Sequence, residues 1–114
     1  MTDNEIVLRY LTQQCSGEAN ATTRSIIVKQ LFQLYNVEIE ERDLRDIIGH
    51  LKEQGHPIGS GNTGIFLCES PEEKDRAGMR QISMGQRNLE QGRLLLAMAK
   101  KQREENQYAG VTTL

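Results

Sequence analysis

Aromatic residues are scarce in this sequence, which has no Trp, two Phe and three Tyr among 114 residues. A hydrophobic core must therefore be built mainly from Ile, Leu, Val and Met, which suits a small domain with a modest interior. No apolar run approaches the length needed to cross a bilayer, and the first ten residues lack the basic start and apolar stretch of a signal peptide. We therefore expect a cytoplasmic protein without a membrane partner.

Cysteine and histidine are also rare, which limits the chemistry that side chains can supply. Cys15 and Cys68 are distant in sequence, and in a reducing compartment each is expected to be a free thiol. His50 and His56 have no third or fourth ligand at suitable spacing, so no metal site is predicted. No catalytic triad or paired-carboxylate arrangement can be proposed. We expect a protein that binds a macromolecule, uses no cofactor and is not an enzyme.

The net charge of −2 conceals an uneven distribution along the chain. Residues 1–70 hold six basic and ten acidic side chains, whereas residues 76–103 hold seven basic side chains and the single acid Glu90. The overall balance argues against an indiscriminate nucleic-acid binder. The charge that can attract phosphate lies mainly in the C-terminal segment.

Three helices are predicted in the first half of the chain. Thr2, with Glu5 three residues later, forms a capping-box pattern that starts the first helix. A second helix over 22–36 begins at a threonine cap, and a third over 40–54 is stopped by Gly55. The apolar periodicity of the second helix is carried by Ile26, Ile27, Gln30, Leu31 and Leu34, and that of the third by Leu44, Ile47, Ile48 and Leu51.

The periodicity then changes from helix to strand. Residues 56–59 and 64–68 are short, apolar and β-prone, and residues 60–63 join them, which predicts a hairpin. Residues 59–64 spell GxGxxG, the letters of a dinucleotide-binding turn. That turn requires a helix after it, and here a strand follows. The glycines are therefore expected to serve the hairpin, and no nucleotide should bind.

A long helix is predicted after the hairpin. Ser70 caps it, Pro71 takes its first position, and it continues to about residue 105. The sequence thus divides into a domain over 1–69, a long helix over 70–105 and a flexible tail over 106–114.

The segment over 22–68 has a distinctive order of features: a capped helix, a short turn, a second helix and a glycine-rich hairpin. The second helix ends in LKEQGHPI, in which Leu51, Gly55 and the Pro57-Ile58 entry to the hairpin are the most specific marks. These features resemble the winged helix-turn-helix domain of many bacterial and phage DNA-binding proteins. The resemblance implies a mainly α fold with a small β-hairpin, and a regulator of transcription or an accessory factor of DNA replication.

Under this hypothesis the third helix enters the major groove of duplex DNA, and the second helix and the hairpin contact the backbone. The residues expected to contact DNA are Arg24, Lys29, Arg42, Arg45, Asn62, Arg80 and Arg87. The alternative hypothesis is an adaptor that docks on a replication or transcription protein. Four acids of the third helix, Glu40, Glu41, Asp43 and Asp46, favour this alternative, because carboxylates repel phosphate.

One face of the long helix alternates small and large residues at spacings of four and three. We call this face the seam, and its residues are Gly78, Ile82, Gly85, Leu89, Gly92, Leu96 and Ala99. Such a pattern is typical of a helix that pairs closely with another helix. We expect a homodimer, most naturally antiparallel, and the alternative is a helix that folds back along the first one. The opposite face carries a basic stripe, whose residues are Arg76, Arg80, Arg87 and Lys101.

Overall fold

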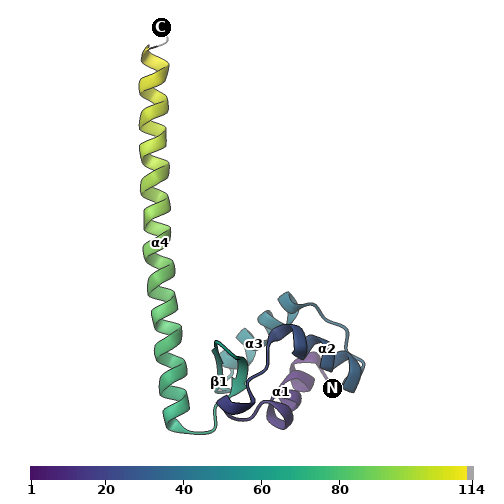
Figure 1. The fold of residues 1–114 in the computed structure, drawn as a ribbon. Coiled ribbons are helices and arrows are strands. Elements are labelled where there is room, and N and C mark those ends of the chain that lie inside the picture. The colour runs from purple at the N-terminus through teal and green to yellow at the C-terminus, as the bar shows by residue number, and fades with distance from the viewer. Residues whose placement is uncertain (113–114) are drawn as a thin grey trace. The chain divides into compact units, whose positions relative to one another are not determined.

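The computed structural model describes residues 1–112, with side chains through residue 108. The elements follow in the order α1 (Asp3–Gln14), the short 3-10 helix η1 (Glu18–Asn20), α2 (Arg24–Tyr35), α3 (Glu41–Glu53), β1 (Ile58–Gly61), β2 (Gly64–Leu67) and α4 (Pro71–Thr112) (Figure 1). They form two compact units, Met1–Met79 and a second unit that begins at Arg80. The predicted mainly helical class, with a small hairpin and a long C-terminal helix, is confirmed.

The predicted start of α1 and the predicted end of α3 are also confirmed. The Thr2 hydroxyl accepts the backbone N–H of Glu5 at 3.2 Å and donates to its carboxylate at 3.1 Å. α3 begins after Glu40, whose N–H donates to the Asp43 carboxylate at 3.0 Å. Gly55 follows α3 with φ of 95°, a conformation that glycine adopts without steric cost.

The hairpin pairs β1 with β2 in antiparallel register, from Ile58 opposite Leu67 to Gly61 opposite Gly64. Asn62 and Thr63 form the turn, so the prediction that GxGxxG serves a hairpin is confirmed. The positive φ, of 127°, falls at Gly64 rather than at Gly61.

The other edge of β2 is occupied by the segment between α1 and α2. Thr22 and Ile65 exchange two backbone hydrogen bonds, of 3.0 and 2.8 Å. Further along, the Leu67 N–H donates to the Cys15 carbonyl and the Gly17 N–H donates to the Leu67 carbonyl, each at 2.8 Å. The backbone groups of β2 are therefore satisfied on both sides, and the hairpin is fixed to the helical part of the unit.

Two glycines of the hairpin permit close approach of neighbouring groups. A Cβ on Gly64 would collide with the backbone of Thr22 and would lie 2.7 Å from the amide nitrogen of Thr23. A Cβ on Gly59 would lie 2.7 Å from the Phe66 ring. These two positions therefore exclude any side chain.

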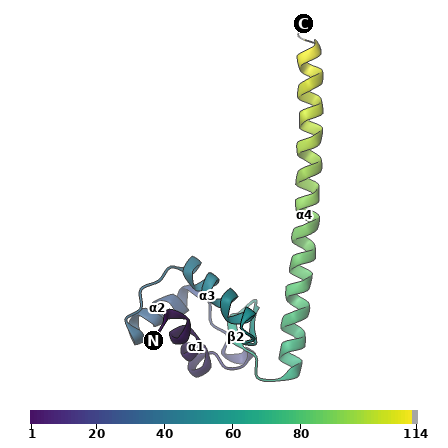
Figure 2. The ribbon, with the colours of Figure 1, turned by 180° about the vertical axis from the view of Figure 1, so that it is seen from behind.

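The core lies between α1, α2, α3 and the hairpin, which are grouped together in Figure 2. Tyr10 is fully buried, and its hydroxyl donates to the side-chain oxygen of Gln30 on α2. Cys15 and Cys68 are buried free thiols. The largest fully buried side chains are Tyr10, Phe66, Leu11, Ile27, Leu31, Leu44 and Leu51. As expected from the composition, aliphatic residues supply most of this interior.

The apolar face predicted for α2 is only partly buried. Ile27 and Leu31 lie in the core, whereas Ile26 is 46% exposed and Leu34 is 57% exposed. Ile26 lies about 100° around the helix from Ile27, outside the strip that the core covers. Leu34 lies on the side of Leu31 but in the last turn, before the left-handed cap at Asn36. The prediction was therefore wrong for Ile26 and Leu34.

α4 begins at Pro71 as predicted, and the Ser70 hydroxyl accepts the N–H of Glu73 at 3.1 Å. The helix runs on to Thr112, past the end predicted near residue 105. Residues 106–109 contain neither Pro nor Gly, so no helix-stopping residue follows Glu105 directly. The last two residues of the predicted tail lie outside the described residues.

Candidate functional site

α3 directs its two arginines away from the core. With about 100° per residue, Arg42 lies about 170° from the centre of the buried side of α3, and Arg45 about 110°. Both side chains are exposed. The buried residues that define the inner side are Leu44, Ile47, Ile48 and Leu51. The guanidinium groups are therefore accessible to a partner that approaches the outer face of α3.

Neither of these arginines is neutralised within the chain. Among residues 1–112, no carboxylate lies within ion-pair distance of Arg42 or Arg45. Ion pairs do occur elsewhere, for example between Arg76 and Glu18 at 3.1 Å. Both α3 arginines can therefore offer their donors to a phosphate or to a base edge.

Two acids of α3 lie on the side of the helix that faces away from Arg45. Asp43 and Asp46 line a hollow that we call the acidic hollow, together with Asp3 and Asn4 of α1 and Glu38, Ile39 and Ile47. On the helical wheel, Arg45 lies on the other side of the outer face, about 100° from Asp46 and about 160° from Asp43. Asp43 is also engaged by the Glu40 N–H. Arg45 is therefore separated from Asp43 and Asp46, whereas Asp46 lies one helical turn after Arg42 and Glu41 lies one turn before Arg45.

Lys52 lies on the same side of α3 as Arg45 but is half-buried. Its burial lowers the pKa of the Lys52 ammonium below the ordinary lysine value, and the nearby Cys68 acts in the opposite direction. Lys52 is therefore less suited to bind phosphate than Arg42 and Arg45 are.

The other residues predicted to contact DNA in the first unit lie on two further elements. Arg24 occupies the first position of α2, Lys29 lies in the middle of that helix, and both are exposed. Asn62 is exposed in the turn between β1 and β2. α2, α3 and the hairpin pack on one core, so all five predicted contacts belong to one compact unit. Arg80 and Arg87 belong to the second unit.

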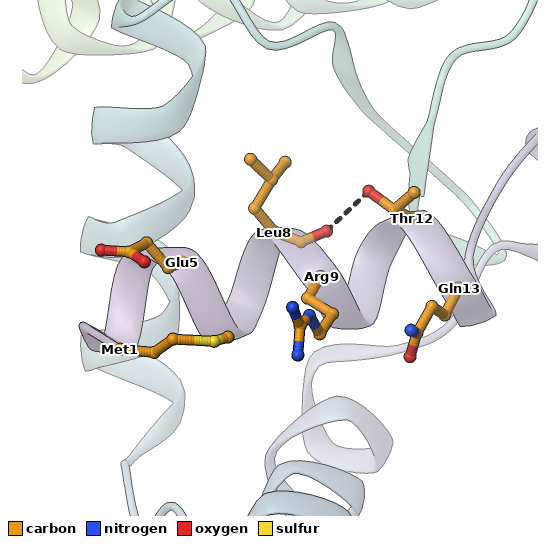
Figure 3. A pocket seen from close by; sticks show the side chains of 6 residues that line it. All are labelled: Met1, Glu5, Leu8, Arg9, Thr12 and Gln13. Carbon is orange, nitrogen blue, oxygen red and sulfur yellow. Dashed lines mark hydrogen bonds between the residues drawn. The ribbon is translucent and has the colours of Figure 1, made fainter.

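A second hollow lies along the outer face of α1, and Figure 3 shows that its lining side chains come from this helix and from Met1 just before it. They are Met1, Glu5, Leu8, Arg9, Thr12 and Gln13. The Thr12 hydroxyl is engaged by the carbonyl of Leu8 at 2.8 Å. The hollow has walls from no second element, and its polar groups do not converge on one point as they do in a small-molecule site.

The junction between β2 and α4 contains two residues whose contacts the sequence pattern did not indicate. The Glu73 carboxylate accepts the N–H of Glu69 at 2.8 Å and the N–H of Glu18 at 2.9 Å. These hydrogen bonds, with a further contribution from Arg76, hold the pKa of Glu73 below the ordinary glutamate value. Arg76 pairs with Glu18 and is therefore not freely available to phosphate, although the sequence placed it in the basic stripe.

The first unit extends to Met79, and these contacts join the first turns of α4 to η1. A Ser-x-x-Glu pattern at Ser70 predicts only that the Glu73 carboxylate returns to the start of its own helix. Its reach to η1 depends on the tertiary position of Glu18, which the pattern does not contain.

The seam of α4 consists of exposed large residues and of glycines. No described side chain packs against these glycines, so their small size serves no contact among the described residues. Ile82, Leu89 and Leu96 are 58%, 55% and 73% exposed. Beyond the neighbouring helix backbone, no described atom lies within 4 Å of a Cβ placed on Gly78, Gly85 or Gly92. Each interior glycine costs a helix about 1 kcal/mol relative to alanine. The described residues supply no packing around these glycines that offsets this cost.

The basic stripe continues along the opposite side of α4. Arg80 and Arg87 lie seven residues apart, and Lys101 lies two further heptads on, so the three share one side. Arg87 and Lys101 are exposed, and Arg80 is half-buried.

Residues 1–112 contain no group of three His, Cys, Asp or Glu side chains placed to hold a metal ion. No helix in this part of the chain combines the length and the apolar character needed to cross a membrane. Comparisons of the chain with protein-family models, with curated proteins and with solved structures gave no match. Function is therefore inferred from the arrangement of the side chains.

Proposed function

We propose that the Met1–Met79 unit is a winged-helix domain that binds duplex DNA through the outer face of α3. The observation that carries the proposal is the pair of exposed arginines, Arg42 and Arg45, which have no carboxylate partner within the described chain. Arginine is the side chain best suited to the acceptors of guanine and to phosphate. The unit binds its target and performs no catalysis.

The arrangement of elements supports this proposal. α2 and α3 are joined by a short connection, residues 36–40, and the hairpin follows α3 directly. The segment that ends at Thr22 pairs with the outer edge of β2, which gives the hairpin a fixed base. In a winged helix the second helix of the pair enters the major groove while neighbouring elements contact the backbone.

In this mechanism Arg42 and Arg45 approach base edges. The carboxylates of α3 restrict the positions on DNA at which the unit binds. The acids on the side of the acidic hollow repel phosphate, so a misplaced duplex binds weakly. Arg24 and Lys29 on α2 and Asn62 in the turn contact the backbone and set the register. This mode of DNA binding suits a cytoplasmic transcription regulator or a replication accessory factor of a bacterium or phage.

The second candidate function is a protein-interaction adaptor, and the acidic hollow favours it. Asp3, Glu38, Asp43 and Asp46 are positioned to receive a basic segment of a replication or transcription protein. The exposed Ile26 and Phe32 of α2 add apolar surface. They lie about 120° apart on the helix, so they do not form one apolar face with each other.

Selection from a random duplex pool tests the proposal. The wild-type chain should enrich a motif, and Arg45→Ala should lose or change that motif. Arg9→Ala is a matched control because Arg9 is an exposed arginine on α1, outside the proposed face. Absence of enrichment by the folded wild-type protein would contradict DNA recognition. A protein partner whose binding is abolished by Asp46→Lys, a change in the acidic hollow, would support the adaptor in its place.

A further inference from the structure

The three glycines of the seam differ from the glycines of the hairpin in what surrounds them. Side chains on Gly59 and Gly64 would collide with Phe66 and with the Thr22 backbone, so the fold of the chain explains both positions. Gly78, Gly85 and Gly92 are surrounded by open space within the chain. Their spacing of seven residues places them on one side of α4, alternating with exposed Ile and Leu. Within the described residues, no contact requires a small residue at these three positions.

We propose that α4 pairs with α4 of a second copy of this chain, in antiparallel orientation and centred near Arg87. In an antiparallel pair, residues whose numbers sum to 174 lie opposite one another. Ile82 then lies opposite the second copy's residue 92, Leu89 opposite its residue 85, and Leu96 opposite its residue 78. The two-fold axis repeats each of these layers, so a glycine receives a large side chain at every level.

The parallel alternative packs the same residues poorly. With the two copies in register, each large residue meets itself and each glycine meets a glycine. The Ile and Leu layers would hold the helices apart, and the glycine layers between them would leave voids. Because helix interfaces reach interior packing density, the antiparallel register fits this sequence better. It also places the two helix dipoles in opposition.

The charges beside the seam fit the same register. Glu72 and Lys100 occupy equivalent flanking positions of the heptad, separated by four repeats. In the antiparallel pair the flanking positions that approach each other have numbers that sum to 172 on the side of Glu72 and Lys100, and to 176 on the other side. Lys100 of each copy therefore lies beside residue 72 of the other, and two ion pairs close the ends of the interface. Both side chains are exposed in the single chain.

Near the centre, the flanking residues that meet across the axis are uncharged. Gln86 meets its own copy and Asn88 meets its own copy, so no like charges oppose each other. Arg87 lies on the outer side. A second copy of the chain thus covers the apolar seam and also pairs Glu72 with Lys100. For this reason we assign the seam to self-association. This inference stands independently of the proposed DNA binding.

Light scattering over a range of concentrations tests the pairing. The full chain should give about twice the 12.9 kDa mass at high concentration. Combining Gly85→Leu with Gly92→Leu should separate the helices and shift the midpoint of dimerisation at least tenfold upward. Ser83→Leu is the matched control, because it adds the same side chain away from the seam and should leave the midpoint unchanged.

Cysteine cross-linking tests the register. Asn88→Cys should form a disulfide-linked dimer on mild oxidation, because position 88 meets its own copy. Gln81→Cys is the matched control, since it occupies the same heptad position one repeat earlier. In the antiparallel pair the two copies of position 81 lie about 18 Å apart along the axis, so no cross-link should form. The wild-type chain, with Cys15 and Cys68 buried, supplies the background.

Charge exchange tests the ends of the interface. Lys100→Glu should weaken the dimer, and adding Glu72→Lys to the same chain should restore it. A chain that stays monomeric at high concentration would overturn the proposal, whether α4 folds back or binds another protein. Equal cross-linking at positions 81 and 88 would overturn the antiparallel register. Loss of DNA binding with an intact dimer would contradict only the proposed function.

Discussion

The carboxylate of Glu73, in the first turn of α4, accepts the backbone N–H of Glu18 at 2.9 Å across 55 residues of sequence. Its second oxygen accepts the N–H of Glu69 at 2.8 Å. One half-buried side chain thereby joins the start of α4, the segment after the hairpin and η1. The ionised form makes these contacts, so the junction is sensitive to protonation.

The first prediction concerns acid stability. Because folding lowers the pKa of Glu73, its carboxylate contributes stability above the unfolded-state pKa of about 4.3. That contribution should be lost as the pH falls through the lower pKa of the folded state. Glu73→Gln should lower the urea midpoint at pH 7 and flatten its dependence on pH below about 4. Glu90→Gln, the same change elsewhere on α4, should alter neither, and an equal effect of both changes would contradict the assignment.

The second prediction concerns two glycines with opposite surroundings. Gly64→Ala should destabilise the first unit by at least about 1–3 kcal/mol, since alanine at φ of 127° is strained and its Cβ meets the Thr22 backbone. Gly49→Ala should stabilise it by about 0.5–1 kcal/mol, because Gly49 lies inside α3 with nothing within 4 Å of a Cβ. Thermal unfolding of both variants measures the difference. If Gly64→Ala leaves the thermal unfolding midpoint unchanged, the hairpin does not approach Thr22 this closely.

The third prediction concerns the α3 arginines. On the selected DNA site, Arg45→Ala should weaken binding by about 1–3 kcal/mol and relax specificity at one position. Titration of fluorescent duplexes carrying single base changes measures both effects. Uniform weakening on every duplex would show that Arg45 contacts phosphate and does not read a base.

The fourth prediction concerns the basic stripe. Arg87→Ala should weaken all duplexes alike and reduce the slope of log affinity against log salt by about one. Arg80→Ala should have the same effect if the half-buried guanidinium of Arg80 reaches the DNA phosphates. Affinity measured at several salt concentrations decides this, with Arg9→Ala as the control. An unchanged slope for Arg87→Ala would exclude α4 from the DNA contact.

Much of the fold could be predicted from the sequence where local chemistry decides it. The Thr2 and Ser70 caps, the Gly55 stop and the hairpin over 58–67 each depend on residues a few positions apart. The inner face of α3 was predicted correctly because its four apolar residues fall within a narrow arc. Local patterns of this kind do not require knowledge of the tertiary neighbours.

Features that depend on tertiary neighbours could not be predicted in this way. The exposure of Ile26 and Leu34 reflects how much of α2 the core covers, and periodicity does not contain that information. The contact of Glu73 with Glu18 requires the position of η1. At the candidate site, the sequence identified Arg42 and Arg45 of α3. It showed the acids only as their neighbours along the chain. The hollow that Asp43 and Asp46 form with Asp3 and Asn4 becomes visible only once α1 is in place.

The glycines of α4 also have a consequence for how the amount of protein controls its behaviour. If α4 pairs as proposed, a helix weakened every seventh residue is stabilised when a second helix covers it. Its ordering should therefore follow the total protein concentration, and amide exchange should be fastest near Gly78, Gly85 and Gly92 in dilute solution. If each dimer brings two domains to neighbouring DNA sites, occupancy will rise more steeply than in proportion to abundance. The chain would then respond sharply to its own level in the cell.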